Sequence, residues 1–284
     1  MSQSGAIVCI GECLWDVLPT GRQPGGAPYH VATHLQRLGQ RVQLISRLGN
    51  DELGTELLAV IEQQGLNSQL IQRSQTHLTG VVKVNGGAGS RAYKIVEPVA
   101  WDYVRHSEQL RSAVADARML VYGSLAARHP VTRETLYRLL QVARFKVFDV
   151  NLRPPHYTRT VVKYLLRQAD FVKLNELELH EIMGWLGQPS TEATALPWLA
   201  GHFNLQAVCL TKGAASVTLW HQHQLFQRAS LPGFEQHSLG SSDAFLAALL
   251  THWNSPDGLR AAAHDFAVLQ QQQLPRPSQP TTAG

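Results

Sequence analysis

The sequence of 284 residues has only three cysteines, Cys9, Cys13 and Cys209, and no Cys-x-x-Cys pair. An odd number of scattered cysteines is typical of reduced thiols rather than of a disulfide framework. No apolar run approaches the roughly 20 residues that a membrane-spanning helix needs. The first residues, MSQSGAIVCIGE, lack the basic start and the apolar core of a signal peptide. These absences predict a cytoplasmic protein with no membrane partner.

Charge is also scarce and evenly spread. Charged residues make up 16% of the chain, and the net charge of +4 includes no run of Lys and Arg with interleaved aromatic residues. This distribution argues against a nucleic-acid partner. The Walker phosphate-binding pattern is missing. The only close glycine cluster, at 86–89, lies in a predicted hairpin and opens no helix, which argues against a nicotinamide-dependent oxidoreductase.

Short apolar segments alternate with helical patterns along most of the chain. Strands are predicted at 6–10, 42–46, 119–122, 145–150, 170–173 and 207–211, and helices at 29–38, 51–64, 132–142, 158–168, 176–183 and 191–200. This alternation predicts an α/β fold with a mainly parallel sheet covered by helices on both faces. Residues 79–84 and 91–96 alternate around a glycine-rich turn, which predicts a hairpin in a small appended sheet.

The most informative stretch is LPGFEQHSLGSSDAFLAALL, residues 231–250. Its second half is apolar on every face and predicts a buried helix that begins after a polar turn at 240–243. Such a helix N-terminus attracts phosphate through its backbone N–H groups and its dipole. Asp243 could cap this helix, or it could accept a proton from a hydroxyl that attacks the phosphate.

Other polar residues follow predicted strands, at the edge where parallel sheets bind ligands. Any one of them could be a simple cap or turn residue, as Asn175 could be for the helix that follows it. Together they supply acids for a metal ion, cations for phosphate and an anion-binding turn, which suits phosphoryl transfer. These residues are Asp149, Asn151, Arg153, Asn175, Glu178, Thr211, Lys212 and Gly213.

In this order the segments resemble the ribokinase-like (PfkB) carbohydrate kinase family, and within it the fructokinase-type members. The resemblance runs from about residue 7 to residue 267. The matching segments are Gly11-Glu12 with Asp16, Gly25-Gly26-Ala27-Pro28 with Arg37-Leu38-Gly39, 47–54, 149–154, Asn175-Glu176-Leu177-Glu178, Thr211-Lys212-Gly213 and Gly240-Ser241-Ser242-Asp243.

The resemblance implies a Rossmann-like, three-layer domain over residues 1–269, with a small β-sheet lid from about 12–28 and 77–103. Residues 270–284 would form a disordered polar tail, and the lid sheet could mediate a homodimer. The substrates would be a sugar and ATP, with Mg²⁺ near Glu178. Asp243 would be the catalytic base beside Gly240, Ser241 and Ser242. The sugar would contact Asp16, Gly25, Gly26, His30 and Arg153, and the nucleotide would contact Asn175, Thr211, Lys212, Gly213 and Gly240.

Several positions depart from the family pattern. His237 replaces an Asp that helps to hold a monovalent cation, which puts K⁺ activation in doubt. Ser242 replaces a glycine, at a cost of about 1–2 kcal/mol if the backbone there needs a positive φ. His30 replaces an Asn; it could pair with His34 on a metal ion, although nothing else in the sequence completes such a site.

The C-terminus looks shortened, so that part of the adenine wall would be missing. Two interpretations therefore remain open. The chain is either a working ATP-dependent sugar kinase, with fructose as the first candidate, or a catalytically impaired relative that binds a sugar or a nucleotide.

Overall fold

The computed structural model of the chain describes residues 5–85, 92–212, 216–229, 240–253 and 257–273. A sheet of nine strands forms the centre of the molecule, in the order β13-β12-β11-β10-β9-β8-β1-β4-β5. The strands from β5 to β11 are parallel, and β12 and β13 add an antiparallel hairpin at one edge. The strands are β1 (Ile7–Ile10), β4 (Val42–Gly49), β5 (Ile71–Ser74), β8 (Met119–Gly123), β9 (Lys146–Asp149), β10 (Phe171–Asn175), β11 (Ala207–Lys212), β12 (Ser216–His221) and β13 (Gln224–Ala229).

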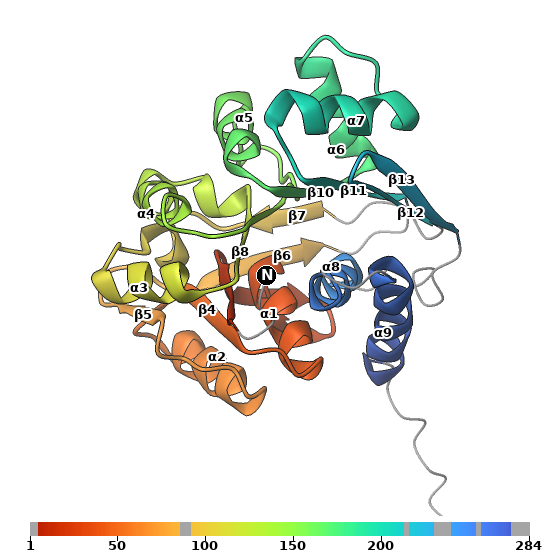
Figure 1. Cartoon of the computed structure of the whole chain (residues 1–284). Helices are drawn as coiled ribbons and strands as arrows, with labels where there is room; N and C mark the ends of the chain where they lie inside the picture. The colour runs from red at the N-terminus through yellow and green to blue at the C-terminus, as the bar shows by residue number, and fades with distance from the viewer. Residues whose placement is uncertain (1–4, 86–91, 213–215, 230–239, 254–256, 274–284) are drawn as a thin grey trace, which may run out of the picture.

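Helices cover both faces of this sheet (Figure 1). On one face lie α1 (Ala27–Arg37), α2 (Glu52–Gln63), α8 (Ser241–Thr251) and α9 (Gly258–Gln273). On the other lie α3 (Glu108–Asp116), α4 (Pro130–Leu140), α5 (Arg159–Gln168), α6 (Glu176–Trp185) and α7 (Glu192–Phe203). Ile7 and Cys9 point into the first layer, and Val8 and Ile10 point into the second. Because both faces are buried, a central strand such as β1 is apolar at every position, and the predicted α/β fold is confirmed.

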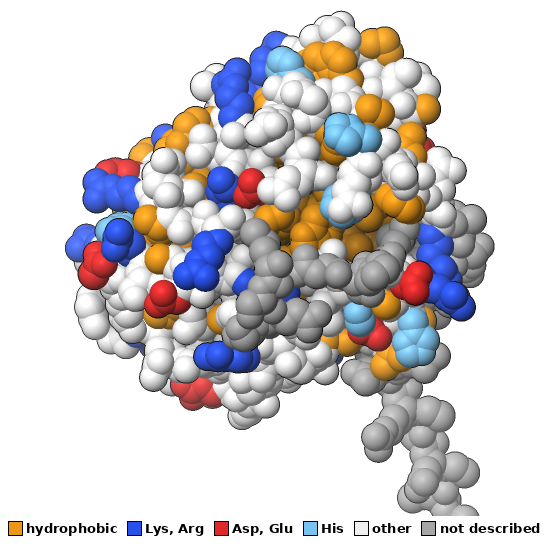
Figure 2. Space-filling view, in the orientation of Figure 1, with side chains coloured by type: hydrophobic (Ala, Val, Ile, Leu, Met, Phe, Trp, Pro, Cys, Tyr) orange, Lys and Arg blue, Asp and Glu red, His pale blue; other side chains and the backbone are white. Residues whose placement is uncertain are grey.

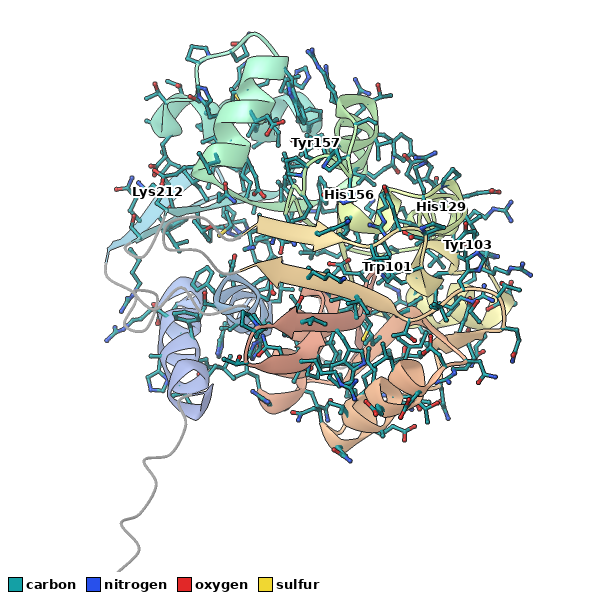
Figure 3. All side chains as sticks on the ribbon, turned by 180° about the vertical axis from the view of Figure 1, so that it is seen from behind. Trp101, Tyr103, His129, His156, Tyr157 and Lys212 are labelled. Atoms are coloured by element: carbon teal, nitrogen blue, oxygen red, sulfur yellow. The ribbon has the colours of Figure 1, made fainter. Side chains whose placement is uncertain are left out.

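A second sheet of four strands packs beside the first and faces the viewer in Figure 3. Its order is β3-β2-β6-β7. The predicted hairpin forms β6 (Gly80–Asn85) and β7 (Ala92–Ile95), and β2 (Leu14–Leu18) and β3 (Gly21–Gly25) complete the sheet. The turn of the hairpin at 86–91 lies outside the described residues.

The C-terminal part of the chain corrects one prediction. Helix α9 runs from Gly258 to Gln273, so the residues from 270 to 273, predicted to begin a disordered tail, are helical. Phe266 on α9 meets Phe245 on α8 in an edge-to-face contact, with ring centroids 5.9 Å apart. This packing supports a helix that continues into glutamines, which have good helix propensity. The rest of the predicted tail, 274–284, lies outside the described residues.

Among the described residues, no helix combines the length and the apolar character needed to cross a membrane.

Candidate active site

A cavity of about 100 Å³ lies between the carboxyl ends of the central strands, the small sheet and the N-termini of α1 and α8. Its wall is drawn from segments far apart in the sequence. The lining residues are Glu12, Leu14, Asp16, Gly26, Ala27, His30, Val82, Ile95, Leu125, Asn151, Arg153, Gly240 and Asp243. We call this space the acceptor pocket.

The acceptor pocket brings together most of the residues predicted to bind the sugar. Asp16, Gly26, His30 and Arg153 line it. Gly25 stands directly beside the Asp16 carboxylate, because a Cβ atom at Gly25 would lie 2.3 Å from Asp16 Oδ2. His30 is neutral at pH 7, since burial is the main cause that lowers its pKa below the usual value.

Helix α8 begins as the sequence predicts, but its cap is Gly240 and not Asp243. Gly240 has φ 86° and ψ 0°, a left-handed conformation that favours glycine. Its carbonyl accepts the first helical hydrogen bond, from the Ala244 N–H at 2.9 Å. No side chain caps this helix, and Asp243 sits in its first turn. The interpretation of Asp243 as a capping residue is therefore wrong.

The expected strain at Ser242 is also wrong. Ser242 lies inside α8, and the positive φ in this turn belongs to Gly240. The backbone at position 242 therefore has no need of a glycine, and the cost expected for the serine does not arise. Ser241 and Ser242 occupy the first turn of α8 but do not line the acceptor pocket.

The Asp243 carboxylate is buried at the floor of the acceptor pocket, with 9% of the residue exposed. The pKa of Asp243 is raised to about 7, mainly by burial and also by the nearby charge of Asp149. Lys173 and Arg153 act in the opposite direction. The result is a carboxylate that can change protonation state near neutral pH, which suits a general base.

A buried ion pair lies beside Asp243. Lys173 Nζ donates to Asp149 Oδ1 at 2.8 Å, and both side chains are at least 94% buried. The two residues are paired neighbours on the parallel strands β9 and β10. Burial alone would lower the pKa of Lys173, but the charges of Asp149, Asp243 and Glu178 outweigh it and the pKa is raised. Lys173 therefore stays charged.

The sequence reasoning missed two charged residues of this region, Glu12 and Lys173. Both could have been recognised in the sequence, because Lys173 interrupts the apolar strand FVKLN and Glu12 directly follows the first strand. The pKa of Glu12 is raised to about 7, mainly by burial and to a small extent by the charge of Asp243. The apolar wall residues Leu14, Val82, Ile95 and Leu125 carry no signal, because similar residues occur throughout the core.

Of the residues predicted to bind nucleotide, Gly240 lines the acceptor pocket, whereas Asn175, Thr211 and Lys212 do not. The Asn175 side chain accepts from the Glu178 N–H at 2.9 Å, as the N-cap of α6. Lys212 forms an ion pair with Glu192 of α7, and Figure 3 shows it at the margin of the molecule, far from Trp101 and His156. Thr211 ends the buried part of β11 beside Asn175. Gly213 and His237 lie outside the described residues.

Glu178 is engaged by the backbone. Its Oε1 accepts from the Leu152 N–H at 2.8 Å and its Oε2 from the Asn175 N–H at 2.9 Å. Among the described residues, no group of three or more His, Cys, Asp or Glu could hold a metal ion, so the idea of a His30–His34 metal site finds no support there. Asp149 Oδ2 is buried without a hydrogen-bond partner. These acids fit a magnesium ion that keeps several of its waters and binds phosphate, as Mg²⁺ commonly does.

Gly26 supports the acceptor pocket through close contact and gives a testable expectation. Its φ is 111°, and a Cβ atom there would lie 2.3 Å from the carbonyl oxygen of Glu12. Gly21 also has a positive φ, 133°, but a Cβ atom there would meet nothing within 4 Å. Gly26→Ala should therefore lower the free energy of unfolding by about 1–3 kcal/mol more than Gly21→Ala, because only Gly26→Ala adds overpacking to backbone strain. Urea unfolding of both variants measures the difference, and equal losses would contradict it.

A buried acid lies beside a helix N-terminus at the carboxyl edge of a parallel α/β sheet, an edge at which such sheets commonly bind ligands. The model of the pfkB family of carbohydrate kinases matches residues 7–267, so the chain belongs to this family.

Curated relatives agree with this assignment. The chain is 28% identical to the fructokinase of Escherichia coli over 273 residues, which cover 89% of this chain and 85% of that protein. It is 27% identical to the fructokinase of Klebsiella pneumoniae over 285 residues, with 94% and 91% covered. The chain is therefore a carbohydrate kinase, a phosphotransferase similar to the fructokinases.

Solved structures share the fold. The fructokinase from Xylella fastidiosa with bound ATP superposes with a TM-score of 0.80 at 22% identity, covering 93% of this chain and 90% of that one. A PfkB protein from Polaromonas sp. JS666 gives a TM-score of 0.80 at 20% identity, with 96% and 97% covered. The ribokinase-like fold predicted from the sequence is thus confirmed.

Proposed function

We propose that this carbohydrate kinase transfers the γ-phosphoryl group of ATP to a hydroxyl group of a fructose-like sugar, with Asp243 as the general base. One observation carries the proposal. A buried carboxylate of raised pKa lies in the first turn of α8, so that a proton acceptor and an anion-binding helix N-terminus occupy the same place.

The reaction would run in the acceptor pocket as a single displacement. Asp243 takes the proton of the attacking sugar hydroxyl while the sugar oxygen forms a bond to the γ-phosphorus. The bond between the γ-phosphorus and its bridging oxygen breaks, and ADP leaves with the electron pair. The backbone N–H groups that begin α8, and the guanidinium of Arg153, stabilise the negative charge of the phosphoryl group in flight. Asp16 and His30 orient the sugar.

Magnesium would neutralise the phosphate charge, as in other phosphoryl transfers. The residues that would hold it are Asp149 and Glu178, through bound water, because the Glu178 oxygens already accept backbone N–H groups. The weakened K⁺ activation predicted from His237 stays a prediction. ADP release in potassium and in sodium buffers measures it.

The nucleotide would lie beside α8. Figure 2 shows hydrophobic side chains gathered on this face near the position of α8 in Figure 1, which suits a stacked base. Gly240 begins α8, and Thr211 lies near the end of β11 beside Asn175, so both could contact the nucleotide. Lys212 would have to leave Glu192 before it could reach a phosphate.

The small sheet would act as the lid of the acceptor pocket, because Leu14, Asp16, Val82 and Ile95 on its strands line that pocket. A homodimer through this sheet is a separate proposal, supported by exposed apolar side chains at Val17 on β2 and at Leu78, just before β6. Light scattering of the purified chain tests it.

The impaired-relative interpretation has less support than the sequence alone gave it. Two departures from the family pattern that favoured this interpretation concern Ser242 and the C-terminal part of the chain. Ser242 lies in ordinary helical backbone, and α9 is present and packs on α8. His237 and the predicted loss of part of the adenine wall still favour that interpretation.

The direct test is ADP release from Mg-ATP in the presence of a panel of neutral sugars that includes D-fructose. The proposal expects turnover with at least one sugar and little ADP release without it. A sugar that raises the melting temperature but supports no turnover would instead favour the binding-protein interpretation.

The raised pKa of Asp243 predicts the pH dependence of the reaction. A base must be ionised to act, so kcat/KM should rise as the pH increases through about 7 and then level off. Arg153 lowers the pKa of Asp243, so Arg153→Met should move the rise to higher pH. Glu12 titrates in the same range, so the profile is also recorded in Glu12→Gln. A flat profile around pH 7 in that variant would argue against Asp243 as the base.

A further inference from the structure

Glu12 has one carboxylate oxygen with a structural role and one without. Its Oε1 accepts a hydrogen bond from the Ala27 N–H at 3.1 Å, which ties the loop after β1 to the start of α1. Its Oε2 is buried and has no hydrogen-bond partner. Only 3% of the residue is exposed, and the residue lines the acceptor pocket. Buried polar atoms are almost always paired, so the unpaired oxygen calls for a partner that the protein does not supply.

We infer that Glu12 is a specificity-determining residue of the acceptor pocket, whose Oε2 accepts a hydrogen bond from a hydroxyl group of the bound sugar. The inference rests on the proposed function for the identity of the pocket. It goes further by adding a contact that neither the family resemblance nor the comparisons assign. It requires a phosphoryl-acceptor substrate that presents a hydrogen-bond donor to Glu12 Oε2.

The charge of the pocket favours the same class of ligand. Glu12, Asp16 and Asp243 contribute three carboxyl groups to the lining, against the single guanidinium of Arg153. A sugar that carries its own phosphate or carboxylate would face these three carboxyl groups, with only the Arg153 guanidinium among the lining residues to offset the repulsion. A neutral polyhydroxylated sugar avoids that repulsion and supplies the donors that carboxylates need.

The backbone holds Glu12 in place. Gly26 packs so closely on it that a Cβ atom at Gly26 would lie 2.3 Å from the Glu12 carbonyl oxygen and 3.3 Å from Glu12 Cγ. Together with the bond from Ala27, this contact limits how far the side chain can move to find another partner. The carboxylate is therefore positioned before the sugar arrives, which reduces the entropy cost of binding.

The test compares sugar binding by the wild-type chain and by Glu12→Gln. Glutamine keeps an oxygen for the Ala27 N–H and replaces the unpaired oxygen with an amide donor, so the fold should persist. Titration calorimetry measures the affinity of both proteins for D-fructose and for each of its singly deoxygenated analogues. Glu62→Gln is the matched control, since Glu62 is exposed and outside the pocket.

In the wild-type chain, one deoxy analogue should bind about 10- to 100-fold more weakly than fructose, as expected for loss of a hydrogen bond to a charged group. Fructose itself should bind Glu12→Gln more weakly than it binds the wild type, by a similar factor. The affinity of that analogue should fall by no more than the affinity of fructose falls. Glu62→Gln should behave as the wild type. A purely structural role for Glu12 would leave the ranking of the analogues unchanged.

The inference is overturned if Glu12→Gln binds fructose as tightly as the wild type. It is also overturned if every analogue loses the same amount of affinity relative to fructose in both proteins, or if the wild type binds none of the sugars. Because binding needs no turnover, the proposed function can fail separately. The predicted binding pattern without ADP release would uphold the role of Glu12 and reject the kinase reaction.

Discussion

Asp243→Asn is expected to lower kcat for sugar phosphorylation by about 10²–10⁴-fold while the sugar affinity changes little. Asparagine keeps the shape of the side chain but cannot accept the proton of the attacking hydroxyl. It also removes a buried carboxyl group whose pKa is raised to about 7, so the variant should fold at least as stably as the wild type near neutral pH. Steady-state ADP release and calorimetric sugar binding measure the two quantities.

Asp116→Asn is the matched control for this substitution. Asp116 ends α3 on the outside of the molecule, where its carboxylate accepts a hydrogen bond from Ser112 at 3.4 Å. The control should retain full turnover. If Asp243→Asn also retained turnover within a few-fold, Asp243 would not be the base.

Lys173→Met is expected to lower the free energy of unfolding at pH 7 by about 3–5 kcal/mol, because it leaves the buried Asp149 carboxylate without a partner. The lost cation also lowers the pKa of Asp243 in the wild type, so any residual turnover should need a higher pH. Urea unfolding and a pH–rate profile measure the two effects.

The double variant Asp149→Leu with Lys173→Met separates the charge from the packing. Replacing a buried ion pair with apolar side chains is often neutral, whereas removing one partner is costly. The double variant should therefore be more stable than Lys173→Met alone. If Lys173→Met cost less than about 1 kcal/mol, or if the double variant were the less stable of the two, the ion pair would not have the role given to it here.

The sequence predicted the layered fold because the pattern that specifies it is local. The strand Ile7–Ile10 is apolar at every position and buried on both faces, which is typical of a parallel sheet. Strand β5 and helix α3 went unpredicted. Two of the four β5 residues, Gln72 and Arg73, are only half-buried, and α3 buries only Leu110 and Val114. Short elements with so little buried surface have weak periodicity.

The site was harder to predict because its chemistry depends on contacts across the sheet. Asp149 and Lys173 are 24 residues apart and meet only because β9 and β10 pair in one register. Excluding Asp243 as the N-cap depended on the left-handed φ of Gly240, which no spacing rule supplies. Asn175 shows the reverse case, since its local capping pattern describes its position fully.

The most direct measurement of the central claim is the product formed from D-fructose and Mg-ATP by the wild-type chain. Phosphorus NMR and mass spectrometry follow ATP, ADP and any sugar phosphate in the same reaction. The account predicts one sugar monophosphate for each ADP released, and no such product with Asp243→Asn. ADP formed without a sugar phosphate, or an intact mixture in which the sugar is nevertheless bound, would contradict it.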